Sequence, residues 1–311
     1  MNTSLYVGVI SVLALYPKWV PAGLRHQDHA DILKRIKLEL TSVQERFDRS
    51  SIVPIRVRFH NASNATVKLP LDLGMPMGVE LYWTDPDGAK SRVQFLHERV
   101  SSTGSFSAEI QPGSCFQGTL FASPSILREN PYDRLGFKAP KVGSWSLSAV
   151  YTNEAGSVKA NDLKITIEES TRTLESHEEI FKGERWHRFA AGQEIKADEL
   201  ATFKEYVRSA SVSPQKDIMG YIVGRRLENK LKAADAYEVF NKVLHSVPSN
   251  VSRSQLQLRM AHCCLNLERF DEALGLLQQV DTTAIDGPAN RVRELTDIAL
   301  KGNERKAKER K

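Results

Sequence analysis

The chain has 311 residues, of which 41% are hydrophobic, so it is long enough to bury sizeable cores and predicts about two domains of roughly 150 residues each. This composition argues against disorder over the whole length. The net charge of +5 does not indicate nucleic-acid binding, because the last eleven residues hold six Lys or Arg against two Glu and the remaining chain is nearly neutral. We expect residues 304–311 to be a solvated, frayed basic tail rather than a nucleic-acid footprint.

An uncharged run near the N-terminus suggests export. Residues 5–16 (LYVGVISVLALY) have the length of a signal-peptide core and fall short of the ~20 residues that span a bilayer. Small residues follow at cleavage spacing, with the cut after Ala22, although no Lys or Arg precedes the run. Residues 1–22 are therefore predicted to be a signal peptide of a periplasmic or secreted protein without a stable membrane span. The alternatives are a buried strand, a misassigned start or a retained anchor, and the first two would leave the protein cytoplasmic.

Residues 31–169 are predicted to form an antiparallel β-sandwich. Apolar and polar positions alternate in IKLEL, IRVRF, VELYW and WSLSAVY, as they do in strands with one face on a core and one in water. Turn-forming stretches separate these runs, namely NASN, DPDG, Pro112-Gly113 and NEAG. We expect eight or nine short strands between residues 36 and 167.

The order of these segments resembles the immunoglobulin-like (Ig-like) sandwiches of exported bacterial proteins. In that family a glycine precedes an aromatic residue that opens the penultimate strand, and Gly143, Trp145 and Leu147 match this placement. Trp145 stands where such domains usually have tyrosine, and Leu147 where antibody domains have cysteine. The resemblance covers about 135 residues and implies an Ig-like fold, which hosts many unrelated functions and therefore implies no ligand.

Two patterns in this part have alternative interpretations. Asp85, Asp87 and Gly88 could begin a calcium loop, but the next residues, AKSRV, supply cations instead of oxygen ligands. A hairpin turn is therefore the expected structure. Asn61 and Asn64 each begin an N-x-Ser/Thr sequon, which implies glycosylation only in a host that performs it.

Residues 170–196 are predicted to be a charged linker with a solvated face. The densest titratable cluster of the chain lies here, with His177 beside Glu178 and Glu179, and His187 farther on. A zinc protease would need two histidines four residues apart on a helix, and these two are ten apart. The linker could still pack against one of the domains through its aromatic residues, Phe181, Trp186 and Phe189.

Residues 197–303 contain an internal repeat. An offset of 37 residues superposes seven small or apolar positions, from Tyr221 on Leu258 to Val243 on Val280. Each copy predicts two helices, at residues 217–230 and 233–247 and at residues 252–267 and 270–280, with apolar residues three and four apart. Further helices near residues 198–209 and 288–300 would cover the two ends of the stack.

The repeat resembles the tetratricopeptide repeat (TPR). That family has a small residue in the first helix, an alanine twelve residues later, a large apolar residue four beyond it, and a helix-ending proline. The first copy fits all four positions with Gly224, Ala236, Phe240 and Pro248. The second copy fits with Ala261, Ala273 and Leu277 but has no proline at Ile285, and its offset is 37 rather than 34. The resemblance implies TPR-like α-hairpins, with a generic helical bundle as the alternative.

The three cysteines, Cys115, Cys263 and Cys264, are odd in number and have spacings that suggest no disulfide framework and no metal site. We expect them to be small buried residues. The repeat pairs Cys264 with Leu227 and Cys263 with Arg226, which predicts that Cys264 lies in a hairpin core and Cys263 toward the surface.

Two functions remain open. The first is a non-enzymatic exported protein that serves in protein interaction or envelope assembly, with an unidentified protein partner and an undetermined oligomeric state. The second is an enzyme, or an accessory subunit of one, whose site is not visible as a motif. The sequence has no GxSxG elbow, Walker loop, HExxH motif or dinucleotide-binding glycine fingerprint. No catalytic, cofactor-binding or metal-binding residue is predicted.

Overall fold

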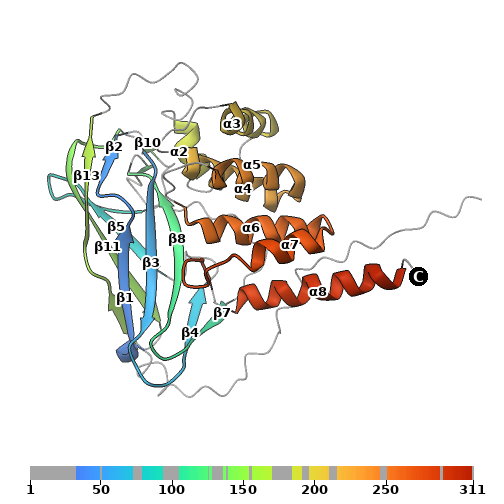
Figure 1. Ribbon diagram of the computed structural model, residues 1–311. Helices are drawn as coiled ribbons and strands as arrows, with labels where there is room; N and C mark the ends of the chain where they lie inside the picture. Colours follow the sequence, from blue (N-terminus) through green and yellow to red (C-terminus); the bar gives the residue numbers. More distant parts are fainter. Residues whose placement is uncertain are drawn as a thin grey trace, which may run out of the picture.

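A computed structural model of the chain (Figure 1) describes residues 33–49, 51–72, 79–93, 105–124, 126–127, 136–137, 139–153, 156–169, 184–190, 196–209, 216–245, 251–287 and 290–309. The described N-terminal residues form mostly antiparallel sheets, here called the β part, and residues 184–309 form helices, here called the helical part. The predicted division into an all-β and an all-α region is confirmed. The predictions for residues 5–16, His177, Phe181 and Pro248 fall outside the described residues.

The β part contains two larger sheets. One has the order β1-β3-β8 and consists of β1 (Ile36–Ser42), β3 (Val53–Asn61) and β8 (Cys115–Ala122). The other has the order β2-β13-β11-β5-β6 and consists of β2 (Arg46–Asp48), β13 (Leu163–Glu168), β11 (Gly143–Asn153), β5 (Val79–Thr84) and β6 (Lys90–Arg92), with β12 (Gly156–Lys159) also paired to β11. Two smaller ladders join β4 (Val67–Asp72) to β7 (Ser105–Ile110) and β9 (Ile126–Leu127) to β10 (Gly136–Phe137).

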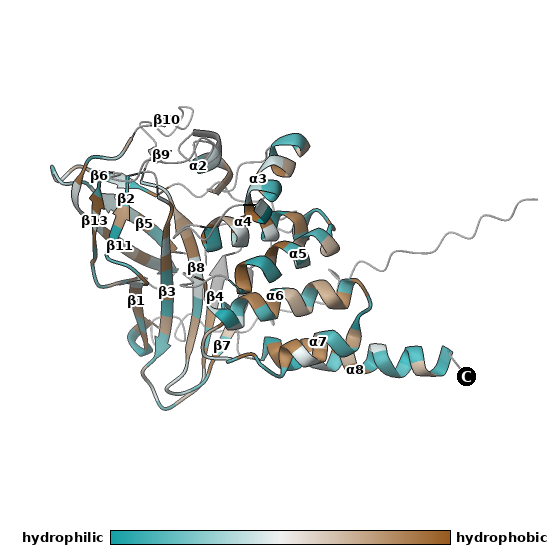
Figure 2. Cartoon of the chain, turned by 45° about the horizontal axis from the view of Figure 1, so that its top comes forward, coloured by the Kyte–Doolittle hydropathy of each residue, from teal (hydrophilic) through white to brown (hydrophobic). Residues whose placement is uncertain are grey.

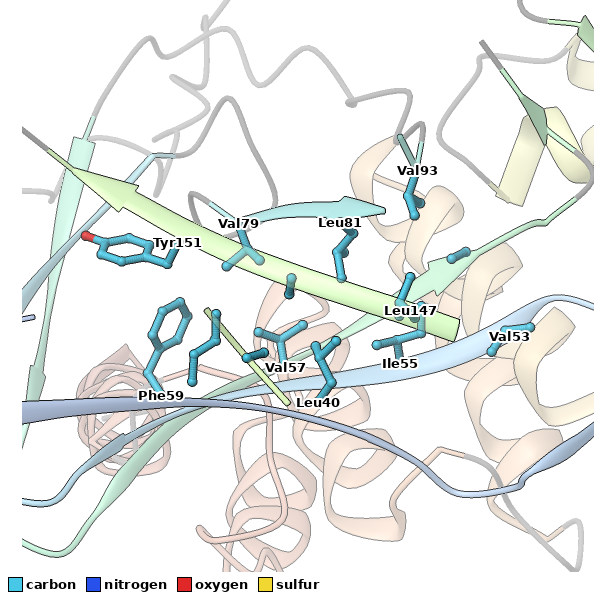
Figure 3. Close-up of a cluster of buried hydrophobic side chains, with 14 of the residues drawn as sticks. Leu40, Val53, Ile55, Val57, Phe59, Val79, Leu81, Val93, Leu147 and Tyr151 are labelled. Atoms are coloured by element: carbon cyan, nitrogen blue, oxygen red, sulfur yellow. The ribbon is translucent and has the colours of Figure 1, made fainter. Parts of the chain in front are cut away.

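The two larger sheets bury their apolar faces against each other. Burial alternates along β5 and β11 with the predicted period of two, because successive side chains point to opposite faces. Phe59 of β3 meets Tyr151 of β11 edge-to-face, with ring centroids 5.3 Å apart, and Figure 3 shows this pair at one end of the core. Trp83 and Trp145 make a second edge-to-face contact at 6.0 Å. Each such side chain contributes roughly 1.5–3 kcal/mol through its burial.

The helical part consists of helices that lie side by side along one side of the β part (Figure 1). They are α2 (Glu184–Ala190), α3 (Ala197–Ser209), α4 (Lys216–Asn229), α5 (Ala233–Leu244), α6 (Arg253–Asn266), α7 (Phe270–Leu277) and α8 (Arg291–Glu309). The four helices predicted from the repeat correspond to α4–α7. The pairs α4–α5 and α6–α7 form two hairpins, and α3 and α8 lie at the two ends.

The turns inside the two hairpins have the same geometry. Leu231, between α4 and α5, has φ 57°, and Glu268, between α6 and α7, has φ 55°. These residues are 37 positions apart, the offset of the sequence repeat. Left-handed backbone is uncommon for residues other than glycine, so its recurrence at this offset shows that the repeat extends from the side chains to the backbone.

The C-terminal helix is longer than predicted. It continues to Glu309, so residues 304–309 are helical rather than frayed. Lys306 explains part of this order, because its Nζ donates to the carbonyl oxygen of Glu268 and lies 5.0 Å from the ring centroid of Phe270. Figure 2 shows that the C-terminal half of α8 is mostly hydrophilic. No helix among the described residues is both long and apolar enough to cross a membrane.

The cysteine predictions are partly wrong. Cys264 is buried as expected, but Cys263 is also fully buried, and Cys115 is exposed. Cys263 packs in the apolar cluster that α6 shares with α4, whereas Cys264 packs in the cluster that α6 shares with α7 and α8. Because α6 has neighbours on two sides, adjacent residues on it can both be buried. Cys115 is exposed because it begins β8 directly after a turn.

Candidate functional site

The junction between the two parts contains a connected set of polar side chains. It is built on β8, whose outward residues contact the helical part. Gln117 Nε2 donates to the carbonyl oxygen of Ile285 at 3.0 Å, and the Gly287 N–H donates to the Gln117 carbonyl at 2.8 Å. Two residues farther on, Thr119 Oγ1 donates to Asp286 Oδ1 at 3.0 Å. The loop after α7 thus pairs with the edge of β8.

Apolar side chains continue the junction. Phe121 of β8 packs on Tyr221 of α4, with ring centroids 5.5 Å apart. Ile52, which precedes β3, is fully buried in the apolar cluster of the helices. The two parts therefore share apolar core as well as hydrogen bonds.

The middle of the junction is almost filled. Gln255 of α6 donates from Nε2 to the Tyr221 hydroxyl at 2.8 Å and accepts the Asp286 N–H at Oε1, also at 2.8 Å. The cavity that remains has a volume of about 10 Å³ and is lined by Arg56, Thr119, Phe121, Tyr221, Val251, Ser252, Gln255, Ala284 and Asp286. This space holds at most one water molecule, so the junction does not enclose a substrate.

A charged group around Glu228 extends the junction outward along α4 and α6. Glu228 is 5% exposed, and its Oε1 lies 2.5 Å from His262 Nδ1. Its Oε2 lies 3.7 Å from both Arg225 Nε and Arg259 Nη1. Burial alone would raise the pKa of Glu228, but Arg259, the hydrogen bond with His262 and Arg225 together lower it to about 2. Glu228 is therefore an ionised partner of these cations and not a proton donor at neutral pH.

Asp286 behaves differently. Burial raises the pKa of its carboxyl, although the hydrogen bonds from Thr119 oppose this. Glu228 therefore stays ionised to a lower pH than Asp286 does.

A second candidate is the contact between Ser123 and His187. Ser123 Oγ lies 2.7 Å from His187 Nδ1, and both residues are buried. Burial lowers the pKa of His187 to about 4, so its imidazole is neutral at pH 7. The predicted solvated face of the linker is wrong at this position. The alternative, that aromatic residues of the linker pack against one of the domains, is confirmed for Trp186 and Phe189, which are buried in the helical core and hold α2 there.

A serine beside a neutral histidine is the geometry of an activated nucleophile. Ser123 is only 4% exposed and His187 only 1%, so a substrate would have to open this contact before it could react. Nothing in the sequence indicated the pair, because the two residues are 64 positions apart and neither belongs to a recognisable motif.

The predicted turn at Asp85 is confirmed. The Gly88 N–H donates to the Asp85 carbonyl at 2.9 Å, and Gly88 has φ 85°, a backbone region that favours glycine. Lys141 Nζ lies 2.6 Å from Asp85 and 2.5 Å from Asp87, so an ammonium group occupies the place between the two carboxylates. No group of three or more potential metal ligands occurs among the described residues.

The two sequons differ in exposure. Asn61 is fully buried, and its Nδ2 donates to the carbonyl oxygens of Ala65 and Ile110. A glycan on Asn61 would be incompatible with this fold. Asn64 is exposed.

A wider groove lies at the far end of the helical part. It has a volume of about 510 Å³ and lies between the start of α7 and the end of α8, where it is lined by Glu268, Arg269, Phe270, Asp271, Glu272, Asn303, Lys306 and Ala307. Its charges are of both signs and largely paired, as in the Lys306–Glu268 contact. The groove therefore shows no preference for one kind of ligand.

Comparisons with known proteins identify no family. No protein-family model and no curated protein match the chain. Among solved structures, a β-glucosidase from Listeria innocua in complex with gluconolactone is 12% identical over 42% of this chain and 16% of that chain, with a TM-score of 0.26. A β-glucosidase from Erythrobacter marinus is 13% identical over 43% of this chain and 16% of that chain, with a TM-score of 0.25. The CARDB domain of a Pyrococcus furiosus protein, in complex with di-metal ions, is 10% identical over 43% of this chain and 87% of the domain, with a TM-score of 0.24. These likenesses are too low to support any argument about fold or activity.

The sequence contained one overlooked signal for the charged group. Arg225 and His262 are 37 positions apart, so they occupy equivalent places in the two repeats, and both contact Glu228. The repeat was identified from its small and apolar positions. The polar positions at the same offset would have suggested a charged stripe along α4 and α6.

Proposed function

We propose that this protein is a non-enzymatic, exported interaction or envelope-assembly module, in which an Ig-like sandwich and TPR-like hairpins present one composite surface. The observation that carries this proposal is the junction. Gln117 and Thr119 bond to the loop after α7, and Phe121 packs on α4, so a partner meets both parts in a fixed arrangement. Repeat scaffolds and sandwiches commonly act through such surfaces.

Strand order and one hydrogen bond support the Ig-like assignment. In that fold the first, second and fifth strands share one sheet, and the third, sixth and seventh share the other. The orders β1-β3-β8 and β13-β11-β5 are compatible with this scheme. Trp145 Nε1 donates to the Lys141 carbonyl at 2.9 Å, which parallels the tyrosine that bonds to upstream backbone in Ig-like domains.

Close helix packing supports the TPR-like assignment. A Cβ atom added to Gly224 would lie 2.4 Å from the Phe240 ring, so the small residue of the first helix meets the large residue of the second. Ala236 and Ala273 are fully buried at equivalent positions. The similar φ angles of Leu231 and Glu268 add a backbone feature to the repeat.

The proposed role is tested with the full-length protein as bait in the envelope fraction of the source organism. We expect one partner to be retained specifically, and retention to survive washing with detergent. If the protein retains no more material than an unrelated bait protein of similar charge, the result would contradict the interaction role.

Export is tested separately by mass spectrometry of the mature N-terminus. The proposal expects the protein to begin at Gly23, after removal of the run at residues 5–16. A protein with an intact Met1 or Asn2 in the cytoplasmic fraction would contradict export.

A hydrolase is the second candidate, and the Ser123–His187 contact of 2.7 Å is the observation in its favour. The test is labelling by a fluorophosphonate probe, which reacts with activated serine hydroxyls. Labelling that disappears in Ser123→Ala but persists in Ser148→Ala, a hydroxyl on another strand, would favour the enzyme over the interaction module. Equal labelling of both variants would remove the enzyme candidate.

A further inference from the structure

Four arginines from three elements surround the corner where the β part meets α4 and α6. Arg56 and Arg58 lie on β3, paired with Thr119 and Gln117 of β8, and Arg225 and Arg259 lie on α4 and α6. We call this set of four arginines the basic corner. Arg56 lines the same small cavity as Tyr221 and Asp286, which brings the two halves of the set to one place.

The arginines on the sheet have few partners. The side chain of Arg56 makes no hydrogen bond or ion pair with any described residue, and the side chain of Arg58 donates to Gln117 Oε1 at 2.9 Å. On the same face, Glu39 pairs with Lys37 at 2.6 Å and lies directly across from Arg58 in the strand register, so its charge is shared between these two cations. Among the described residues, the sheet side of the corner therefore presents Arg56 without a carboxylate partner, and Arg58 with a carboxylate neighbour that Lys37 also engages.

The arginines on the helices are only partly satisfied. Arg225 and Arg259 are 35% and 26% exposed, and each has a buried Nε without a hydrogen-bond partner. Glu228 attracts both from 3.7 Å, which is beyond hydrogen-bond distance. Asp286 is the other carboxylate nearby, and it accepts from Thr119. Together with Glu39, the four guanidinium groups thus face three carboxylates, each of which already has another partner.

We propose that the basic corner binds an acidic polypeptide segment of the partner, an inference that rests on the proposed interaction role. A guanidinium group donates two parallel hydrogen bonds to a carboxylate, so side-chain carboxylates are well matched to these arginines. The cavity between the parts is too small to enclose a free anion. A ligand therefore lies across the corner, from β3 to α4, and a chain with spaced carboxylates spans that path.

The test measures fluorescence anisotropy of a short labelled glutamate-rich peptide with the full-length protein. Arg56→Gln combined with Arg58→Gln removes two charges from the corner. The matched control, Lys159→Gln combined with Lys164→Gln, removes two charges from exposed positions on β12 and β13 of the other sheet. We expect the corner variant to weaken binding at least about tenfold and the control to change it less than about twofold, since a lost bidentate contact has this order of effect.

A second variant, Arg225→Gln, covers the helical side without leaving a buried charge alone. Glu228 keeps Arg259 and His262 as partners in this variant. Binding that weakens in this variant, while its far-ultraviolet circular dichroism stays unchanged, supports a corner formed by both parts. Unchanged binding overturns the helical half of the inference.

Three other results overturn the inference as a whole: no binding of the glutamate peptide, equal binding of its glutamine counterpart, or equal loss in the corner and control variants. Binding of labelled single-stranded DNA with the same dependence on Arg56 and Arg58 also overturns it, because the corner would then recognise phosphate chains. If the corner variant, used as bait in the envelope fraction, retains a partner as well as the unmodified protein does, the interaction role is supported and the basic corner is excluded as the binding site.

Discussion

Gly224 sits so close to the ring of Phe240 that the first hairpin depends on the absence of a side chain there. An added Cβ would lie 2.4 Å from the ring, whereas one added to Gly275 of α7 meets nothing within 4 Å. We predict that Gly224→Ala lowers the free energy of unfolding by about 1–3 kcal/mol through overpacking. Gly275→Ala should raise it by roughly 0.5–1 kcal/mol, because alanine favours a helix. Urea denaturation measures the free energy of unfolding of both variants. Equal changes in the two variants would contradict the packing described for α4 and α5.

His187 makes stability depend on pH in a defined range. The pKa of His187 is about 4 in the folded protein and about 6.5 in the unfolded chain. Between these values the unfolded state binds more protons, so the stabilising contribution is complete above pH 6.5 and is lost as the pH falls toward 4. We predict a loss of about 2 kcal/mol between pH 7 and pH 5, measured by urea denaturation at each pH.

The control for this effect is His187→Gln, which cannot titrate in the range. Its stability should be lower at pH 7 but nearly flat from pH 7 to pH 5. Glu228, with a folded pKa of about 2, contributes stability that is lost only as the pH falls from about 4.5 toward 2, so it does not interfere. If the free energy of unfolding of the variant falls with pH as steeply as that of the unmodified protein, groups other than His187 cause the pH dependence.

The junction depends on β8, because the polar residues of this strand hydrogen-bond to the helical part. Gln117 is 2% exposed, and its side chain bonds to the loop after α7. Gln117→Ala leaves backbone carbonyls of that loop without partners, and we predict a loss of about 1–3 kcal/mol in the free energy of unfolding. Gln278→Ala, an exposed glutamine after α7, should change stability by less than about 0.5 kcal/mol. Similar values for the two variants would mean that the junction contributes little.

The elements with strong periodicity could be predicted from the sequence, and their packing partners could not. Alternation identified β3, β5 and β11, and the 37-residue offset identified α4–α7. The outward polar residues of β8 have the pattern of a water-facing strand, yet Gln117 and Thr119 face the helical part instead. A two-residue period distinguishes the two sides of a strand but does not say what covers each side. Cys263 was misplaced for the same reason, since α6 is covered on two sides.

At the scale of the whole molecule, the two parts form one surface instead of two separate ones. Ile52 of the β part lies in the core of the helices, and the Gly287 N–H bonds to β8. The expected linker at residues 170–196 contains α2, whose Trp186 and Phe189 are buried. A partner that binds at the basic corner would therefore contact the sheet and the helices together.

Site-specific photo-crosslinking in the source organism tests this account most directly. A photoreactive amino acid replaces Thr41, which pairs directly with Arg56 on the outer face of the sheet. The control position is Thr152, exposed on β11 of the other sheet. The account predicts one crosslinked protein partner from position 41, none from position 152, and loss of the product when Arg56 and Arg58 are changed to glutamine. Crosslinks of equal yield from both positions, or none from position 41, would contradict a composite binding surface at the corner.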